Sequence, residues 1–179
     1  MADAHSESGL GKATWSHRDF EALSWDLCQI HAIAVTGDEG PPDDLAPEEL
    51  LERDDVDDDA PPAEELHLDI DYIVRRVQGS PWEGVRFWVS PATLVFHDVW
   101  SIGGELRGVW KPMTMTNLIR SEPRYRYESP GWTLVGEGLE LRFAASGFTL
   151  HLRRPPRYGN RVLRMAERGG LSFEPRSFA

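Results

Sequence analysis

The sequence predicts a mainly β, or α+β, domain in which an antiparallel sheet folds into a sandwich or roll. Two observations support this class: seven or so short runs of strand-forming residues, and the glycine- and proline-rich turn signals that separate them. A chain of 179 residues is expected to form one domain. We expect a disordered tail over residues 1–12 and a single domain over residues 13–179, interrupted by a mobile acidic loop at residues 38–65.

The N-terminal half contains two predicted strands. Residues 27–35 are mostly apolar on both faces, which is typical of a strand covered on both sides, and Gly37 ends the run. Residues 66–74 alternate instead, which predicts one buried and one polar face. The buried face carries Leu66, Leu68, Ile70, Tyr72 and Val74, and the polar face carries His67, Asp69 and Asp71.

The second half contains further predicted strands and one helix. The strand segments are residues 85–89, 92–99, 132–135, 139–144 and 148–152. We expect Ser90-Pro91 to interrupt the first two, because proline has no N–H to donate to a sheet. Ser146-Gly147 predicts a two-residue hairpin turn. A short C-terminal helix is predicted over residues 160–168, with Asn160 as its N-cap and Gly169 at its end.

Charge is distributed unevenly along the chain. The protein has 30 acidic and 19 basic side chains and a net charge of −11. Residues 38–65 alone contain 14 acidic residues and one arginine, a net charge of −13, so the remainder carries +2. Because this segment also contains five prolines and few apolar residues, we expect a disordered acidic insert. Residues 120–168 hold ten arginines and five glutamates, which makes the C-terminal third basic.

The candidate metal or acid–base site consists of His67, Asp69 and Asp71. Side chains spaced by two along a strand project from one face, roughly 6.5–7 Å apart. A single metal ion would therefore need a further ligand from a neighbouring strand, for which His31 and the His97-Asp98 pair are candidates. The alternative role is structural: the outer face of a half-buried sheet turns polar side chains toward solvent, and carboxylates on it pair with arginines.

Other motifs give weaker signals. His97 and Asp98 are adjacent in a strand and point to opposite faces, so we expect turn chemistry for Asp98. Cys28 lies in an apolar run, which predicts a buried and inert thiol. Residues 55–59 lack the glycine and glutamate of a calcium loop. The sequence contains no nucleophile elbow, phosphate-binding glycine loop or zinc-helix motif, which favours a protein without enzymatic activity and without a cofactor.

Several sequence blocks stand out together: Trp25-Asp26 with Ile30-His31-Ala32-Ile33, then Leu68-Asp69-Ile70-Asp71-Tyr72-Ile73 (LDIDYI), Phe87-Trp88-Val89-Ser90-Pro91-Ala92-Thr93-Leu94-Val95-Phe96 (FWVSPATLVF) and Ala145-Ser146-Gly147-Phe148. The combination resembles a family of small bacterial proteins that has no assigned activity. The likeness extends over residues 25–155 apart from the acidic insert, which is longer than we expect of that family. The resemblance implies a bacterial, cytoplasmic, single compact domain, and it implies no cofactor and no catalytic residue.

We therefore expect a non-enzymatic protein-interaction domain, inhibitory or immunity-like in its role. The charge contrast leaves three arrangements open: either patch recruits an oppositely charged protein, the acidic insert docks on the basic third, or the insert is solvated without a partner. A metal- or ligand-binding enzyme that uses His67, Asp69 and Asp71 is the alternative function.

Three further expectations concern partners and location. Tyr125, Tyr127 and Tyr158 lie among the C-terminal arginines, but a pI near 4.9 argues against a nucleic-acid partner. No segment approaches the roughly 18 apolar residues of a membrane span, so we expect no membrane partner. Residues 1–12 lack the apolar region of a secretory signal, and the single cysteine fits a cytoplasmic location. The oligomeric state is left open.

Overall fold

The computed structural model describes residues 8–37, 64–79, 82, 84–107, 113–123 and 129–179. The strands are β1 (Thr14–Ser16), β2 (Cys28–Thr36), β3 (Glu64–Gln78), β4 (Val85–Leu106), β5 (Met113–Ser121), β6 (Gly131–Gly136), β7 (Leu139–Ala144), β8 (Gly147–Leu152) and β9 (Arg157–Gly159). The described helices are a 3₁₀ helix, η1 (His17–Ala22), and an α-helix, α3 (Met165–Arg168). The mainly β prediction is confirmed. The predicted acidic loop at residues 38–65 lies outside the described residues except for Glu64 and Glu65, which begin β3.

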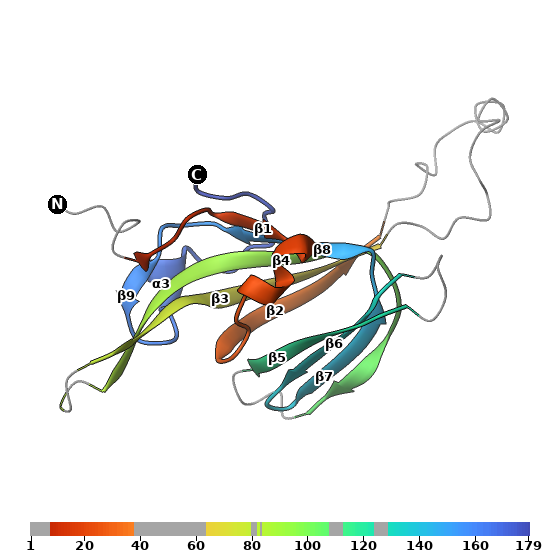
Figure 1. The fold of residues 1–179 in the computed structure, drawn as a ribbon, viewed down its shortest axis with the longest axis horizontal. Helices are drawn as coiled ribbons and strands as arrows, with labels where there is room; N and C mark the ends of the chain where they lie inside the picture. Colours follow the sequence, from red (N-terminus) through yellow and green to blue (C-terminus); the bar gives the residue numbers. More distant parts are fainter. Residues whose placement is uncertain (1–7, 38–63, 80–81, 83, 108–112, 124–128) are drawn as a thin grey trace, which may run out of the picture.

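All described strands belong to one antiparallel sheet that closes on itself (Figure 1). The order along the sheet is β1-β8-β4-β3-β2-β5-β6-β7, and β7 pairs in addition with the end of β4. The strands β4, β3, β2, β5, β6 and β7 therefore form a closed circuit, with β8 and β1 extending from the other part of β4. This arrangement gives the sheet an inner face, which holds the core, and an outer face.

β4 runs without interruption through Ser90-Pro91, so the prediction of two separate segments is wrong. In an antiparallel strand the N–H and C=O of one residue point to the same neighbour. The Pro91 carbonyl accepts a hydrogen bond from the Arg153 N–H at 2.9 Å, so the missing N–H of Pro91 would face that side too. There β4 stops pairing with β9 at Val89 and begins pairing with β8 at Ala92. Pro91 therefore lies at the end of the β4–β8 ladder, where its missing N–H leaves the run of hydrogen bonds from Ala92 onward intact.

The Ser146-Gly147 turn is not a hairpin, because β7 and β8 pair side by side with β4 rather than with each other. β7 and β8 act as one long strand with a bend, and β4 bends beside it at Asp98 and Ser101, whose φ angles are 51° and 57°. The Ser146 hydroxyl lies 2.6 Å from Asp98 Oδ2 across the bend. The expected turn role of Asp98 thus takes the form of a bend that directs β4 from β8 to β7.

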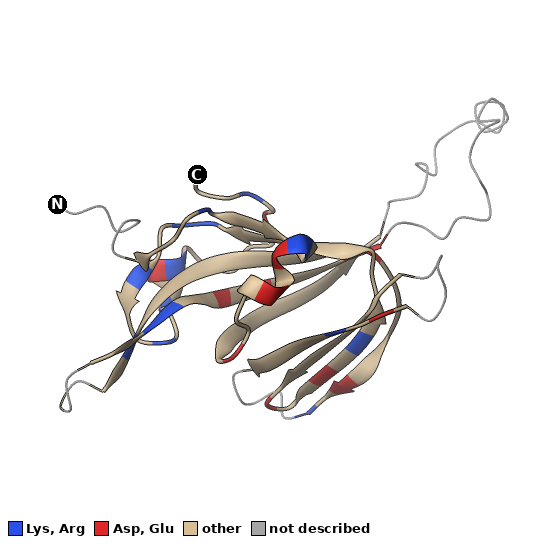
Figure 2. Cartoon of the chain, viewed as in Figure 1, with Lys and Arg blue, Asp and Glu red and all other residues tan. Residues whose placement is uncertain are grey.

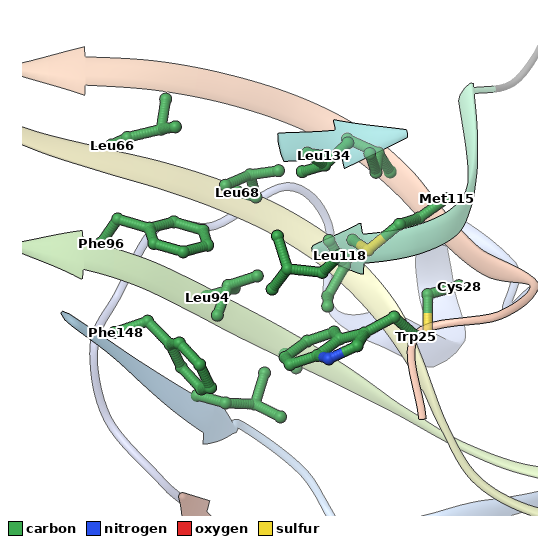
Figure 3. Packing of buried hydrophobic residues seen from close by; sticks show 14 of the residues in the cluster. Trp25, Cys28, Leu66, Leu68, Leu94, Phe96, Met115, Leu118, Leu134 and Phe148 are labelled. Carbon is green, nitrogen blue, oxygen red and sulfur yellow. The ribbon is translucent and has the colours of Figure 1, made fainter. Parts of the chain in front are cut away.

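Apolar side chains from the two sides of the closed sheet form the core (Figure 3). Leu68, Leu94 and Phe148 contribute from β3, β4 and β8, and Met115 and Leu134 contribute from β5 and β6. Edge-to-face ring contacts join an aromatic group within it, with centroids 4.7–6.3 Å apart: Phe20, Trp25, Phe96, Trp132, Phe143 and Phe148. Such contacts favour one defined packing over a merely collapsed interior.

β2 is covered on both faces only at its start. Cys28, Gln29 and Ile30 are buried, whereas Val35 is exposed. A bulge between Ile30 and Ala32 shifts the register against β3, so both Ile30 and Ile33 belong to or pack against the core despite a spacing of three. The predicted double coverage is therefore correct for the first third of the strand and wrong toward Val35.

The C-terminal segment, defined as residues 160–179, lies against the outer face of the sheet. Within it, α3 is shorter than the predicted helix: it begins after Arg164, which replaces Asn160 as the N-cap. Gly169 ends it in the left-handed region at φ 83°, as predicted. Near the other terminus Ser8 is buried and Leu10 packs against the core, while residues 1–7 of the predicted tail lie outside the described residues.

Candidate functional site

The polar face of β3 is covered by the C-terminal segment. Asp69 and Asp71 are fully buried and His67 is 7% exposed. Every residue from Leu66 to Ile73 is buried, so the prediction that the outer face is turned toward solvent is wrong for this part of the strand. The alternation along one strand reports only on that strand, and the residues that cover Asp69 and Asp71 lie about a hundred positions further along the chain. The sequence pattern therefore could not predict this cover.

Asp69 is held by two arginines and one backbone amide. Arg168 donates from Nη1 to Asp69 Oδ2 at 2.8 Å and from Nη2 to Oδ1 at 2.7 Å, a bidentate pair. Arg153 donates to the same Oδ1, and the Ser172 N–H donates to Oδ2 at 3.0 Å. Although burial alone lowers the pKa of the Arg168 guanidinium, its hydrogen bonds to Asp69 raise that pKa above the ordinary value. The guanidinium therefore stays charged beside its carboxylates.

Asp71 joins the same network. Its Oδ1 accepts from Arg168 Nε at 3.2 Å, and its Oδ2 accepts from the Leu163 N–H at 2.9 Å. His31 Nε2 lies 3.0 Å from that Oδ2, so the expected approach of His31 to this face does occur. Arginine pairing was also expected, but the guanidinium of Arg168 comes from α3 rather than from a neighbouring strand. Asp69, Asp71 and Arg168 thus fasten the C-terminal segment to the sheet.

This arrangement supports the structural role for both aspartates. A metal ligand needs a lone pair directed at the ion, and each carboxylate oxygen here already accepts hydrogen bonds. Among the residues that the structure describes, no three His, Cys, Asp or Glu side chains are placed to hold one metal ion. The strand spacing also keeps His67 apart from Asp71, as expected for positions i and i+4.

His67 and His97 come together, but through Glu65 rather than through the aspartates. His67 Nε2 lies 2.7 Å from Glu65 Oε2, and His97 Nδ1 lies 3.0 Å from Oε1. His97 Nε2 lies 2.9 Å from the Thr149 hydroxyl on β8. Although partial burial raises the pKa of Glu65, hydrogen bonds with His97 and His67 hold that pKa below its ordinary value. Sequence reasoning missed Glu65 because it was counted with the acidic insert, although it continues the alternation of β3.

Arginines gather at the end of the sheet formed by β9, α3 and the start of β4 (Figure 2). A surface pocket of about 330 Å³ lies there, lined by Arg86, Arg157, Tyr158, Gly159, Asn160, Val162, Leu163, Arg164 and Glu167. Three arginines and one acidic residue, Glu167, are among the residues that line this pocket. At the other end of the molecule, by contrast, Arg107 pairs with Glu105 and Arg142 pairs with Glu140.

Exposed apolar side chains accompany these arginines. Tyr158 is 53% exposed, Met165 is 50% exposed and Trp82, in the β3–β4 connection, is 95% exposed. Val85 and Val162 are also exposed. We call the whole group the arginine end: Trp82, Val85, Arg86, Arg157, Tyr158, Val162, Arg164 and Met165. The basic C-terminal third was predicted from sequence. Its position beside Arg86 and the β3–β4 connection was not predicted, because that position depends on the pairing of β9 with β4.

Cys28 is fully buried, as expected for a structural thiol. Burial raises the pKa of this thiol to about 12, so almost none of it is present as the nucleophilic thiolate near neutral pH. The side chain fills space in the core beside Met115 rather than forming part of a reactive site.

Comparisons with known proteins do not identify relatives: no protein-family model, curated protein or solved structure matches this chain. Among the described residues, no helix combines the length and apolar character needed to cross a membrane.

Proposed function

We propose that this protein is a non-enzymatic interaction domain whose arginine end binds an acidic segment of a partner protein. One observation carries the proposal: three arginines share a single carboxylate, Glu167, in the lining of a pocket, and exposed aromatic and apolar side chains lie at the same end of the fold. Arg164 forms no ion pair with any described residue, and Arg157 only approaches Glu167, at 4.0 Å. Uncompensated charge of this kind attracts an oppositely charged surface over several ångströms.

The composition of the arginine end favours a protein partner. Tyrosine, tryptophan, methionine and arginine are enriched at protein interfaces, whereas lysine and glutamate are depleted. Trp82, Tyr158 and Met165 supply the apolar contacts, and Arg86, Arg157 and Arg164 supply the charge. Rapid capture by charge steering would suit the inhibitory or immunity-like role that the sequence suggests.

The family, bacterial source and cytoplasmic location remain parts of this proposal. The sequence blocks described above support the family and source, and the single buried Cys28 is compatible with a reducing compartment. Purification of the native protein from a bacterial cytosolic fraction, with Cys28 in the thiol form, is the expected result; recovery from an oxidising compartment would contradict it.

The binding proposal is tested with a fluorescein-labelled 20-residue peptide of glutamate and leucine in a 3:1 ratio. Fluorescence anisotropy at about 50 mM salt measures its affinity for the full chain and for the variant Arg86→Ala/Arg157→Ala/Arg164→Ala. Loss of three ionic contacts at the surface, each worth roughly 0.5–1 kcal/mol, predicts a 10- to 100-fold weaker affinity.

The matched control is Arg18→Ala/Arg120→Ala/Arg142→Ala. It changes net charge by the same amount through exposed arginines on η1, β5 and β7. We expect it to weaken peptide binding by less than about threefold, because long-range charge alone is screened at this salt concentration. Equal weakening by both triple variants, or no peptide binding to the wild type, would contradict the proposal. Preferential binding of a 20-nucleotide single-stranded DNA would replace the protein partner by a nucleic acid.

A further inference from the structure

The pocket within the arginine end has the chemistry of an oxyanion site. Its guanidinium groups come from three places in the chain: Arg86 from β4, Arg157 from β9 and Arg164 from the turn before α3. The lining arginines therefore come from separate segments of the chain, which the pairing of β9 with β4 brings together. Tyr158 and Val162 add apolar wall, and Asn160 adds an amide.

The arginines in the pocket are only partly occupied by protein acceptors. Arg86 Nη1 donates to Asn160 Oδ1 at 3.0 Å, which is a neutral acceptor. Glu167 is the single carboxylate in the lining: its Oε2 accepts from the Arg164 N–H at 2.8 Å, and its Oε1 lies 4.0 Å from Arg157 Nη2. Three guanidinium groups and one carboxylate leave a net charge of +2 in the pocket. Most of the guanidinium N–H groups thus have no acceptor among the described residues.

We infer that this pocket binds the dianion of a phosphate monoester. Each guanidinium presents a planar pair of N–H donors that matches two phosphate oxygens, and three of them can serve all of the non-bridging oxygens. The net charge of +2 balances a dianion, whereas a single carboxylate would leave one positive charge uncompensated. A pocket of about 330 Å³ is larger than a phosphate group, so it also admits part of the group to which the phosphate is attached.

This inference deepens the proposed function, because it places a phosphorylated side chain of the acidic partner segment in the pocket. A nucleoside monophosphate carries the same group, and Tyr158, which lines the pocket and is 53% exposed, is an aromatic partner for its base. The shared chemistry is the phosphate monoester, and the two sources are separated by the probes below.

The test measures binding by calorimetry and by amide chemical shifts with four probes: inorganic phosphate, adenosine monophosphate, an acidic peptide containing phosphoserine, and the same peptide with serine. We expect the phosphoserine peptide to bind at least tenfold more tightly than the serine peptide. We also expect the affinity for the phosphoserine peptide and for adenosine monophosphate to rise several-fold from pH 5.5 to pH 7.5, since the second pKa of a phosphate monoester is about 6 and the dianion is the ligand. Tighter binding of adenosine monophosphate than of the phosphoserine peptide would identify a nucleotide, rather than a phosphorylated side chain, as the source of the phosphate.

Two variants define the site. Arg164→Ala removes an exposed side chain that pairs with no carboxylate among the described residues, so we expect the fold to be retained and phosphate affinity to fall at least fivefold. Arg142→Ala on β7 should leave phosphate affinity unchanged. The inference is overturned if inorganic phosphate and both phosphorylated probes fail to bind, or if Arg142→Ala weakens them as much as Arg164→Ala does. Equal binding of the serine and phosphoserine peptides would overturn the phosphate inference while leaving the proposed function intact. Binding of phosphate without binding of any peptide would overturn the proposed function while leaving the phosphate inference intact.

Discussion

Replacement of Arg168 by methionine is expected to destabilise the protein strongly. The Arg168 side chain is fully buried and donates to both oxygens of Asp69 and to Oδ1 of Asp71. Methionine fills most of the same volume but leaves two buried carboxylates with too few positive neighbours. Breaking a buried ion pair in this way costs about 3–5 kcal/mol. Since a domain of this size has a free energy of unfolding of about 5–15 kcal/mol, the loss is a large fraction of the total.

Urea denaturation followed by tryptophan fluorescence measures the free energy of unfolding, and calorimetry should show Tm lowered by roughly 6–20 °C. Arg164→Met is the matched control: it is the same substitution four residues earlier, at an exposed position, and should change the free energy by less than about 0.5 kcal/mol. A loss below about 1 kcal/mol for Arg168→Met would refute the view that this arginine fastens the C-terminal segment to β3.

Three other predictions follow from the structure. Gly104→Ala should cost about 1–3 kcal/mol of stability, because Gly104 has φ +141° and an added Cβ would lie on the Glu140 carbonyl; Gly103→Ala, with open space and an ordinary φ, is its control. Glu65→Gln should be less stable than wild type at pH 7, and this difference in stability should shrink as pH falls below 4.5. The pKa of Glu65 is lower in the folded protein than its ordinary value, so the stabilisation by the carboxylate is complete above the ordinary pKa and is lost on acidification. A difference that is constant from pH 7 to 3 in denaturation curves would contradict this. Cys28 should react with an aromatic disulfide reagent only as fast as the protein unfolds, and immediate labelling of the native protein would contradict its burial.

The strand pattern of the fold could be predicted because it is local. The alternation of residues 66–74 placed Leu66, Leu68 and Ile70 on the core side correctly, and the strands predicted over residues 132–135 and 139–144 correspond to β6 and β7. Proline and Ser146-Gly147 were misinterpreted because their effects depend on which strand lies beside them. Pro91 is tolerated where β4 changes neighbours, and the Ser146-Gly147 bend continues a strand instead of reversing it.

The candidate site could be predicted only in part. His67, Asp69 and Asp71 do share a face, and His31 does reach Asp71. Their burial could not be foreseen, because it depends on Arg168, which looks in the sequence like one of many arginines in a polar segment. Only a comparison of buried and exposed guanidinium groups separates Arg168, which supports the fold, from Arg164, which faces the pocket.

The most direct test of the proposed function is an amide chemical-shift map of the ¹⁵N-labelled protein during titration with the acidic glutamate–leucine peptide. We predict saturable shifts confined to residue 82 and to residues 84–88 and 157–168, where the arginine end lies, with little change along β5, β6 and β7. Shifts spread evenly over all exposed arginines, or centred on Arg120 and Arg142, would contradict a specific binding surface at the arginine end.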